Sequence, residues 1–146
     1  MAELDFGVRL DWQGTSRDGD GVFSSGGSQM PYSAPASMGG RGVGTNPEEL
    51  LIGAVVSCYS ITLANVLKAA GLPVSRLSVR GEGVVSDYPK SARFSRIHVH
   101  PTIAGTDQAR GDEYRAAARS ARDKCFIGRT VRDHLDYAVG DIAVVA

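Results

Sequence analysis

The sequence predicts a fold of the α+β class, in which antiparallel strands surround one long buried helix. Residues 4–12, 74–85 and 92–103 alternate apolar and polar side chains with the period of a half-buried strand. Residues 50–67 form an 18-residue run without a charged side chain, as expected for a buried helix. A chain of 146 residues is long enough to bury roughly two-thirds of its unfolded surface. We therefore expect a single domain over residues 1–146.

The sequence pattern of the N-terminal part predicts a hairpin followed by a long loop. On the expected strand over residues 4–12, four apolar side chains share one face: Leu4, Phe6, Val8 and Leu10. The sequence GTSRDGDG is typical of a turn, and residues 22–25 predict the returning strand. Residues 26–46 contain six glycines and two prolines and predict a long ordered loop, with one short strand near Gln29–Ser33. Loops of this length in compact domains are often functional or bound to a partner.

A long helix is expected to begin at Pro47 and to run to about Ala70. Asn46 is suited to cap the free amides, and the acids at positions 48 and 49 favour the positive end of the helix dipole. Gly71 is expected to end the helix. Because the helix is apolar on most faces, one small domain can hardly cover it, and we expect a partner subunit to supply the remaining cover.

A membrane-spanning helix is the alternative interpretation, because the apolar run reaches the lower length limit for a span. Four polar side chains dilute the run: Ser57, Ser60, Thr62 and Asn65. The N-terminus also lacks the pattern of a signal peptide. We therefore expect no membrane contact and a soluble helix.

The second half of the chain predicts two further strands, a helix and a closing strand. The strands over residues 74–85 and 92–103 are joined by the turn SDYPKS. Residues 106–124 predict an exposed amphipathic helix whose inner stripe holds Tyr114, Ala117, Ala118 and Ala121. Cys125 follows at the end of this helix, and residues 135–146 predict the last strand.

The charge balance and the number of cysteines indicate which partners and which cellular compartment to expect. Sixteen basic residues balance sixteen acidic ones, and no basic stripe with interleaved aromatics points to nucleic acid. Two cysteines are too few to stabilise a secreted domain, so we expect a cytoplasmic protein. Any bridge between Cys58 and Cys125 would then be transient and chemical.

Cys58, in the middle of the apolar run, has two interpretations. Free cysteine is a small hydrophobe that is often simply buried, whereas a reactive thiol needs a nearby cation. The candidate cations are Arg17, Arg41 and Arg129, which lie among turn residues. Glu48 is either a helix-start acid or the partner that aims such a guanidinium. On a straight helix Glu48 and Cys58 are about 15 Å apart and do not share a face.

Cys125 lies among basic residues, in ARDKCFIGR, so we expect its thiol to be reachable from solvent and more acidic than usual. Such a thiol is suited to resolve a sulfenic acid on Cys58, although a partly buried helix-end cysteine is an equally simple interpretation. His98 and His100 share one face of a strand, but no cysteine or histidine spacing supports a metal site. We expect neither a metal nor a cofactor.

Three segments carry a resemblance to a known family. The most specific is GTNPEELLIGAVVSCYSITLA at residues 44–64, supported by SRDGDGVFSS at 16–25 and ARDKCFIGRTV at 121–131. These segments resemble the OsmC/Ohr family, the osmotically inducible protein C and organic hydroperoxide resistance proteins. The resemblance implies an OsmC-like α+β fold in which two chains intertwine as a homodimer around their long helices. It also implies thiol-dependent reduction of peroxides, with organic hydroperoxides favoured.

On matching positions, Cys58 resembles the cysteine that attacks peroxide, Cys125 the resolving cysteine, and Glu48 the acid that orients an arginine. Arg17 matches the arginine of the Ohr branch, and Arg41 lies near the position used in the OsmC branch; we favour Arg17. The disulfide would be reduced by an external dithiol of the lipoyl or thioredoxin type. Four apolar side chains are expected to line a channel for an alkyl peroxide: Val55, Tyr59, Phe126 and Ile127. The alternatives are a dimeric redox-sensing or ligand-binding protein without turnover and, third, a zinc protein.

Overall fold

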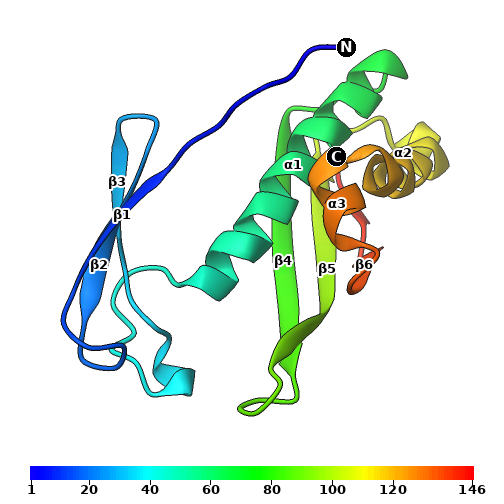
Figure 1. Ribbon diagram of the computed structural model, residues 1–146. Coiled ribbons are helices and arrows are strands. Elements are labelled where there is room, and N and C mark those ends of the chain that lie inside the picture. Colours follow the sequence, from blue (N-terminus) through cyan, green and yellow to red (C-terminus); the bar gives the residue numbers. More distant parts are fainter. The chain divides into compact units, whose positions relative to one another are not determined.

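The computed structural model describes all 146 residues. The chain forms two compact units, Met1–Leu50 and Leu51–Ala146 (Figure 1). Helices and strands are both present in quantity, so the α+β prediction is confirmed. The expectation of one domain over the whole chain stays a prediction.

The N-terminal unit is built on a three-stranded antiparallel sheet. It contains β1 (Arg9–Gln13), β2 (Asp20–Ser25) and β3 (Ser28–Tyr32), in that order. The hairpin and the short third strand are confirmed, but β1 begins at Arg9 and not at residue 4. The pairing begins at Arg9 because Arg9 faces Ser24, near the end of β2, and the chain then turns at Gly26-Gly27 with positive φ angles of 56° and 80°. Residues 4–8 therefore have no strand to pair with in their own chain.

The loop after β3 is ordered by one buried serine. Ser33 is only 1% exposed, and its hydroxyl accepts a hydrogen bond from the Val43 amide at 2.7 Å. The Ser33 amide donates to the Thr45 carbonyl at 3.0 Å, next to a bridge between Tyr32 and Thr45. These bonds connect the two ends of the loop and bring the chain to the start of the long helix.

The long helix, α1 (Pro47–Ala69), begins and ends as the sequence predicts. The Asn46 side chain accepts from the Glu49 amide at 2.8 Å and donates to the Glu49 carboxylate at 2.6 Å, a reciprocal capping pair. At the other end Gly71 has a φ of 64°, and the Leu72 amide donates back to the Leu67 carbonyl at 3.0 Å.

The C-terminal unit contains a four-stranded sheet. Its strands are β4 (Arg76–Ser86), β5 (Arg93–Ala104), β6 (Asp136–Val139) and β7 (Ala143–Val144). The β4–β5 pair is antiparallel, whereas β6 and β7 both pair in parallel with β5.

The predicted last strand over 135–146 is broken at residues 140–142. A side chain at Gly140 would lie 2.3 Å from the His100 ring, and the Asp141 amide donates to His100 Nδ1 at 2.9 Å. The backbone therefore leaves the ladder to bond a side chain, and the strand resumes as β7.

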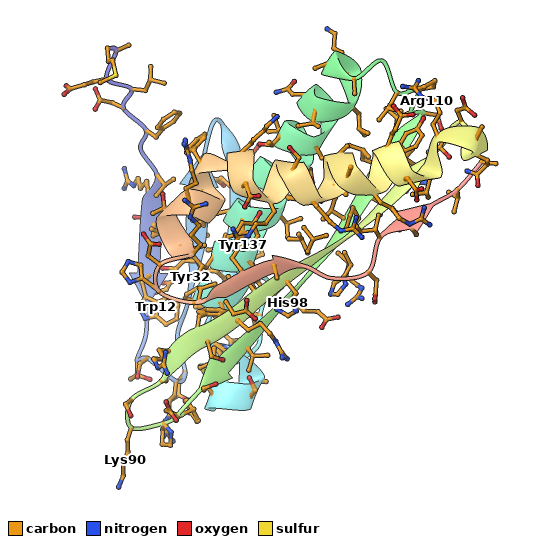
Figure 2. All side chains as sticks on the ribbon, turned by 90° about the vertical axis from the view of Figure 1, so that its right-hand side faces the viewer. Trp12, Tyr32, Lys90, His98, Arg110 and Tyr137 are labelled. Atoms are coloured by element: carbon orange, nitrogen blue, oxygen red, sulfur yellow. The ribbon has the colours of Figure 1, made fainter.

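One core joins α1, α2 (Gly111–Lys124) and α3 (Phe126–Val131) to one face of this sheet (Figures 1 and 2). The α2 stripe of Tyr114, Ala117, Ala118 and Ala121 is buried as predicted. A four-residue spacing gives α1 its buried face, which holds Val55, Tyr59, Leu63 and Leu67. The Tyr59 hydroxyl donates to the Ala118 carbonyl at 2.8 Å and so connects α1 to α2.

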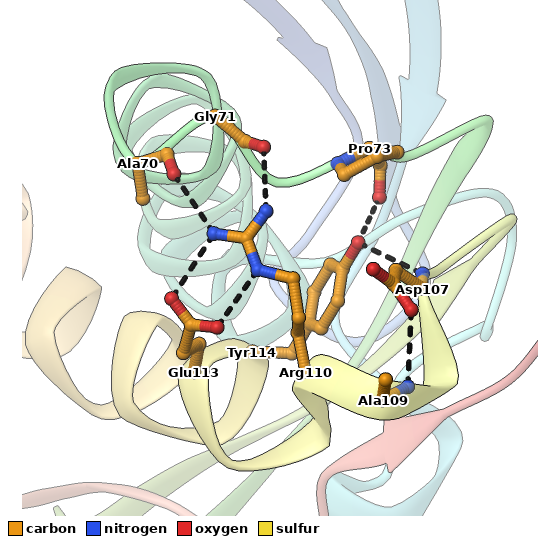
Figure 3. Close-up of polar contacts among 8 residues, drawn as sticks. All are labelled: Ala70, Gly71, Pro73, Asp107, Ala109, Arg110, Glu113 and Tyr114. Carbon is orange, nitrogen blue, oxygen red and sulfur yellow. Dashed lines mark hydrogen bonds and ion pairs between the residues drawn. The ribbon is translucent and has the colours of Figure 1, made fainter.

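The junction between α1 and α2 is connected by Arg110 (Figure 3). Its guanidinium donates to the carbonyls of Ala70 and Gly71, at 3.3 and 3.0 Å, and pairs with both carboxylate oxygens of Glu113, at 3.0 and 2.7 Å. Its hydrogen bond to Glu113 raises the pKa of Arg110 and lowers the pKa of Glu113. A cation thus satisfies the free carbonyls at the end of α1 and positions the start of α2.

The outward face of α1 is uncovered within the chain, so the expected all-round burial is not reached by one molecule. Ile61 is 66% exposed, and Gly53, Ala54, Ser57 and Ala64 are exposed on the same helix. By length and composition α1 is the one helix that qualifies as a membrane span, with 22% of its apolar window buried. Core helices of soluble proteins pass the same test, so this observation is weak evidence for a membrane.

Candidate functional site

The fold brings the two cysteines together, although 67 residues separate them in the sequence. Cys58 lies on α1, half-buried against the core, and Cys125 lies in the core at the junction of α2 and α3. Both are free thiols, and the Cys58 thiol is close enough to Cys125 to raise the pKa of Cys125. Two thiols from distant parts of the sequence therefore lie close together in one core.

Two backbone hydrogen bonds and one side-chain hydrogen bond hold Cys125 in place. Its amide donates to the Ala121 carbonyl at 3.0 Å, which ends α2, and its carbonyl accepts from the Arg129 amide at 2.9 Å, which starts α3. Its sulfur accepts from the Gly128 amide at 3.4 Å. Because Cys125 caps both helices, its thiol is directed into the core.

The expectation of a reachable and acidic Cys125 is wrong. Cys125 is 0% exposed, and its pKa is raised, first by burial and then by the neighbouring Cys58 thiol. The neighbouring cations do not surround the sulfur: Lys124 and Arg129 are exposed, and Arg122 donates to the Tyr137 carbonyl at 2.8 Å. Basic sequence neighbours point outward from the helix while the thiol points inward. Of the two thiols, Cys58 is the more exposed.

Two tyrosines enclose the buried thiol. Burial raises the pKa of both Tyr59 and Tyr137, and negative charge on Cys125 raises each further. The Tyr59 hydroxyl has a partner in Ala118, whereas the Tyr137 hydroxyl is buried without a hydrogen-bond partner. Sequence reasoning missed Tyr137, because an apolar-patterned strand gives no sign of which tyrosine reaches a distant thiol.

Glu48 lies in the first turn of α1, and its Oε2 atom is buried without a hydrogen-bond partner. Since α1 is unbroken from Pro47 to Ala69, Glu48 and Cys58 are separated by about 15 Å of helix, as expected. A buried carboxylate oxygen without a partner is costly, so this position is suited to receive a guanidinium.

The two candidate arginines differ in their partners. Arg41 pairs with Asp20 at 2.6 Å inside the N-terminal unit. The Arg17 guanidinium lies about 4 Å from the position of a side chain at Gly39, and no acidic side chain within that unit pairs with it. Arg17 is therefore the cation without an acidic partner inside this unit, and its role at Cys58 stays a prediction.

Of the four predicted channel residues, two are misplaced. Val55 and Tyr59 are 0% exposed and belong to the closed core, so they do not line an open channel in this conformation. Their spacing of four along α1 places them on its inward face. Phe126 is 59% exposed and Ile127 is half-buried against the core, both directly after Cys125.

The rings of His98 and His100 have protein partners. His98 Nε2 lies 3.0 Å from an Asp136 carboxylate oxygen, and His100 Nδ1 accepts from the Asp141 amide. No group of three or more histidine, cysteine, aspartate or glutamate side chains has the geometry to hold a metal ion.

Comparison with known proteins identifies a family and a relative that are similar to this chain. The family of OsmC-like proteins matches residues 39–139. YmaD of Bacillus subtilis (strain 168), an uncharacterized protein, is 31% identical over 139 residues, which cover 93% of this chain and 92% of YmaD.

Solved structures that share the fold include the following two. An OsmC-like protein of unknown function from Vibrio cholerae superposes with a TM-score of 0.78 at 16% identity, over 96% of this chain and 99% of the other. An organic hydroperoxide resistance protein OsmC from Legionella pneumophila superposes with a TM-score of 0.72 at 21% identity, over 99% and 100%. The family match over most of the chain and the relative at 31% identity lead to one conclusion: this chain belongs to the OsmC/Ohr family of OsmC-like proteins.

Proposed function

We propose that the protein is a thiol-dependent peroxidase that reduces organic hydroperoxides, and hydrogen peroxide less well, to alcohols or water. The observation that carries the proposal is the adjacency of Cys58 and Cys125, one half-buried and one fully buried, in a single core. The Legionella pneumophila structure with the same fold is that of an organic hydroperoxide resistance protein, which agrees with this chemistry.

In the first step the Cys58 thiolate attacks the distal oxygen of the hydroperoxide. The O–O bond breaks, the alkoxide leaves with a proton as the alcohol, and Cys58 becomes a sulfenic acid. In the second step the Cys125 sulfur attacks the Cys58 sulfur, and the hydroxyl leaves with the Cys125 proton as water. An external dithiol then reduces the disulfide and supplies the two electrons of the next cycle.

A guanidinium held by Glu48 would stabilise the Cys58 thiolate. Two observations support this role: the Oε2 atom of Glu48 lacks a partner, and Arg17 has no acidic partner in its own unit. Arg41 is the second candidate, because it is already paired with Asp20. Phe126 and Ile127 add apolar surface next to Cys125, which favours an alkyl over a polar peroxide.

The active form proposed is a cytoplasmic homodimer. Within one chain α1 leaves Ile61 66% exposed, and Leu4, Phe6 and Val8 are 77%, 89% and 58% exposed. Large apolar side chains exposed in this way, in each of the two units, are typical of surface that a second subunit covers.

The test is a titration of free thiols before and after one equivalent of cumene hydroperoxide. The wild type should lose both thiols rapidly, Cys58→Ser should lose none, and Cys125→Ser should stop at a Cys58 sulfenic acid that over-oxidises, visible by mass spectrometry. Ser57→Ala, next to Cys58 on the same helix, is the control and should behave as the wild type. Unchanged thiols in the wild type would instead favour a redox-sensing or ligand-binding protein.

A further inference from the structure

We propose that Tyr137 is a positioning residue for the resolving step: its hydroxyl donates a hydrogen bond to the Cys125 sulfur as negative charge develops there. The inference rests on the proposed function and deepens it, because it assigns a role to a side chain outside the Cys58, Glu48 and arginine set. It begins from one observation, a buried hydroxyl that satisfies no hydrogen bond in the reduced protein.

An unsatisfied buried donor needs an explanation, because burial of a polar group without a partner is unfavourable. Tyr59, on the same side of the core, has satisfied its hydroxyl with the Ala118 carbonyl at 2.8 Å. The Tyr137 ring instead packs on Gly128, whose amide donates to the Cys125 sulfur, so the free hydroxyl belongs to the surroundings of a thiol that is a weak acceptor while it is protonated. A thiolate is a much stronger acceptor, so the hydrogen bond becomes favourable when the proton leaves.

Tyr137 is held firmly enough for its orientation to matter. It projects from β6, where it pairs with Ile97 of β5, and is 1% exposed (Figure 2). Arg122 holds it twice, through its Nε donating to the Tyr137 carbonyl at 2.8 Å and through its guanidinium, which lies 5.3 Å from the ring centroid.

Gly128 creates the space for the ring. A Cβ atom at this position would lie 2.1 Å from Cε2 of Tyr137, so a side chain larger than hydrogen is not compatible with the observed ring position. The same glycine donates its amide to the Cys125 sulfur. The α3 turn therefore supplies one donor to the sulfur and leaves room for a second.

The directions of the pKa shifts agree with this geometry. The hydrogen bond from the Gly128 amide and the neighbouring Tyr137 hydroxyl lower the pKa of Cys125, against the larger effect of burial. Burial first, and then negative charge on Cys125, raise the pKa of Tyr137, as expected for a phenol that keeps its proton beside a thiolate.

A donor already in place lowers the free energy of the charged state without reorganisation at the moment of reaction. In the balanced step, Cys125 loses its proton and attacks the Cys58 sulfenic acid, the S–O bond breaks and water leaves. Tyr137 neither gains nor loses a proton; it only stabilises the sulfur while it carries charge. Removal of the hydroxyl should therefore slow disulfide formation and leave sulfenic acid formation on Cys58 unchanged.

The decisive experiment follows the titration of Cys125 in a Cys58→Ser background by NMR, from the ¹³Cβ chemical shift of labelled cysteine, which needs no reagent to reach the buried thiol. Tyr137→Phe should move the midpoint of the profile to higher pH by about one unit. Tyr114→Phe is the matched control, since Tyr114 is also buried but bonds the Pro73 carbonyl, and it should leave the midpoint unchanged. Fluorotyrosine at position 137, which keeps the ring and makes the hydroxyl a stronger donor, should move the midpoint to lower pH.

An unchanged midpoint in both the phenylalanine and the fluorotyrosine proteins would overturn the assignment. If Tyr137→Phe does not fold, the fluorotyrosine protein decides alone. Failure of the peroxidase hypothesis would appear in the thiol titration instead, as a wild-type protein whose thiols remain free after cumene hydroperoxide is added. The midpoint measurement contains no peroxide, so the two failures are distinguishable.

Discussion

Replacement of Gly128 by alanine should destabilise the protein, because the glycine lies against the face of a buried tyrosine. The added Cβ would lie 2.1 Å from Cε2 and 2.9 Å from Cδ2 of Tyr137, where ordinary contact begins at 3.4 Å. The ring cannot easily move away, since Tyr137 is 1% exposed and its backbone is bonded by Arg122. Overpacking of this kind typically destabilises a core by about 1–3 kcal/mol.

Part of this destabilisation is offset, because replacing a helical glycine by alanine raises the free energy of unfolding by about 0.4–1 kcal/mol where the backbone conformation allows it. The net expectation is a loss of about 1–2 kcal/mol in the free energy of unfolding. For a chain of this length that corresponds to a Tm lower by about 2–8 °C. The assay is urea denaturation followed by circular dichroism, with a thermal melt at the same chain concentration.

Gly111→Ala is the matched control for this prediction. Gly111 is also helical, with φ −51° and ψ −40°, and an added Cβ would contact only the flexible end of Arg115 at 3.1 Å. The same substitution should therefore be neutral or stabilising by up to about 1 kcal/mol. If Gly128→Ala proved as stable as Gly111→Ala, the close packing of Tyr137 against α3 would be refuted.

Three further predictions concern the elements that hold the site. Asn46→Ala removes the cap that bonds the Glu49 amide and should destabilise the protein by about 1 kcal/mol in urea denaturation; an unchanged midpoint would contradict the capping role. Glu113→Gln should lower the free energy of unfolding at neutral pH. The difference from wild type should vanish as the pH falls through the lowered folded-state pKa of Glu113, because a carboxyl group with a depressed pKa stabilises the fold only while it is ionised. A difference that persisted in acid would refute the ion pair. Ile61→Asp, on the uncovered face of α1, should convert a dimer to monomers in analytical ultracentrifugation, whereas an unchanged mass would show that this face is not the interface.

Burial of the proposed resolving thiol changes how the cycle is expected to be controlled. Burial raises the pKa of the Cys125 thiol, which favours its protonated form in the reduced protein. Protection of Cys125 from the bulk peroxide would favour disulfide formation over direct oxidation of Cys125. The half-buried Cys58 is then the thiol that meets the substrate.

Much of the secondary structure could be predicted from local signals alone. Asn46, Pro47 and Gly71 determine where α1 begins and ends because caps and stops act within a few residues. The stripe of Tyr114 and three alanines follows from the period of a helix, and the paired strands β4 and β5 follow from the period of two. The motif around Cys58 was specific enough to indicate the family.

The errors came where distant segments compete for the same backbone or the same space. The last strand is interrupted because the Asp141 amide bonds His100, 41 residues away, and β1 begins late because its partner strand is short. Val55 and Tyr59 were assigned to a channel because the side of α1 that faces the core depends on tertiary packing.

Most of the helices and strands, the family and the two thiols could be recognised from short-range patterns in the chain. Tertiary packing decides that Cys125 is buried, that Arg122 bonds the Tyr137 carbonyl, and that the Tyr137 hydroxyl is buried without a partner. The environment of a thiol is set by what packs within a few ångströms of it. For Cys125 those neighbours come from α1, α3 and β6, and no local pattern around residue 125 encodes them.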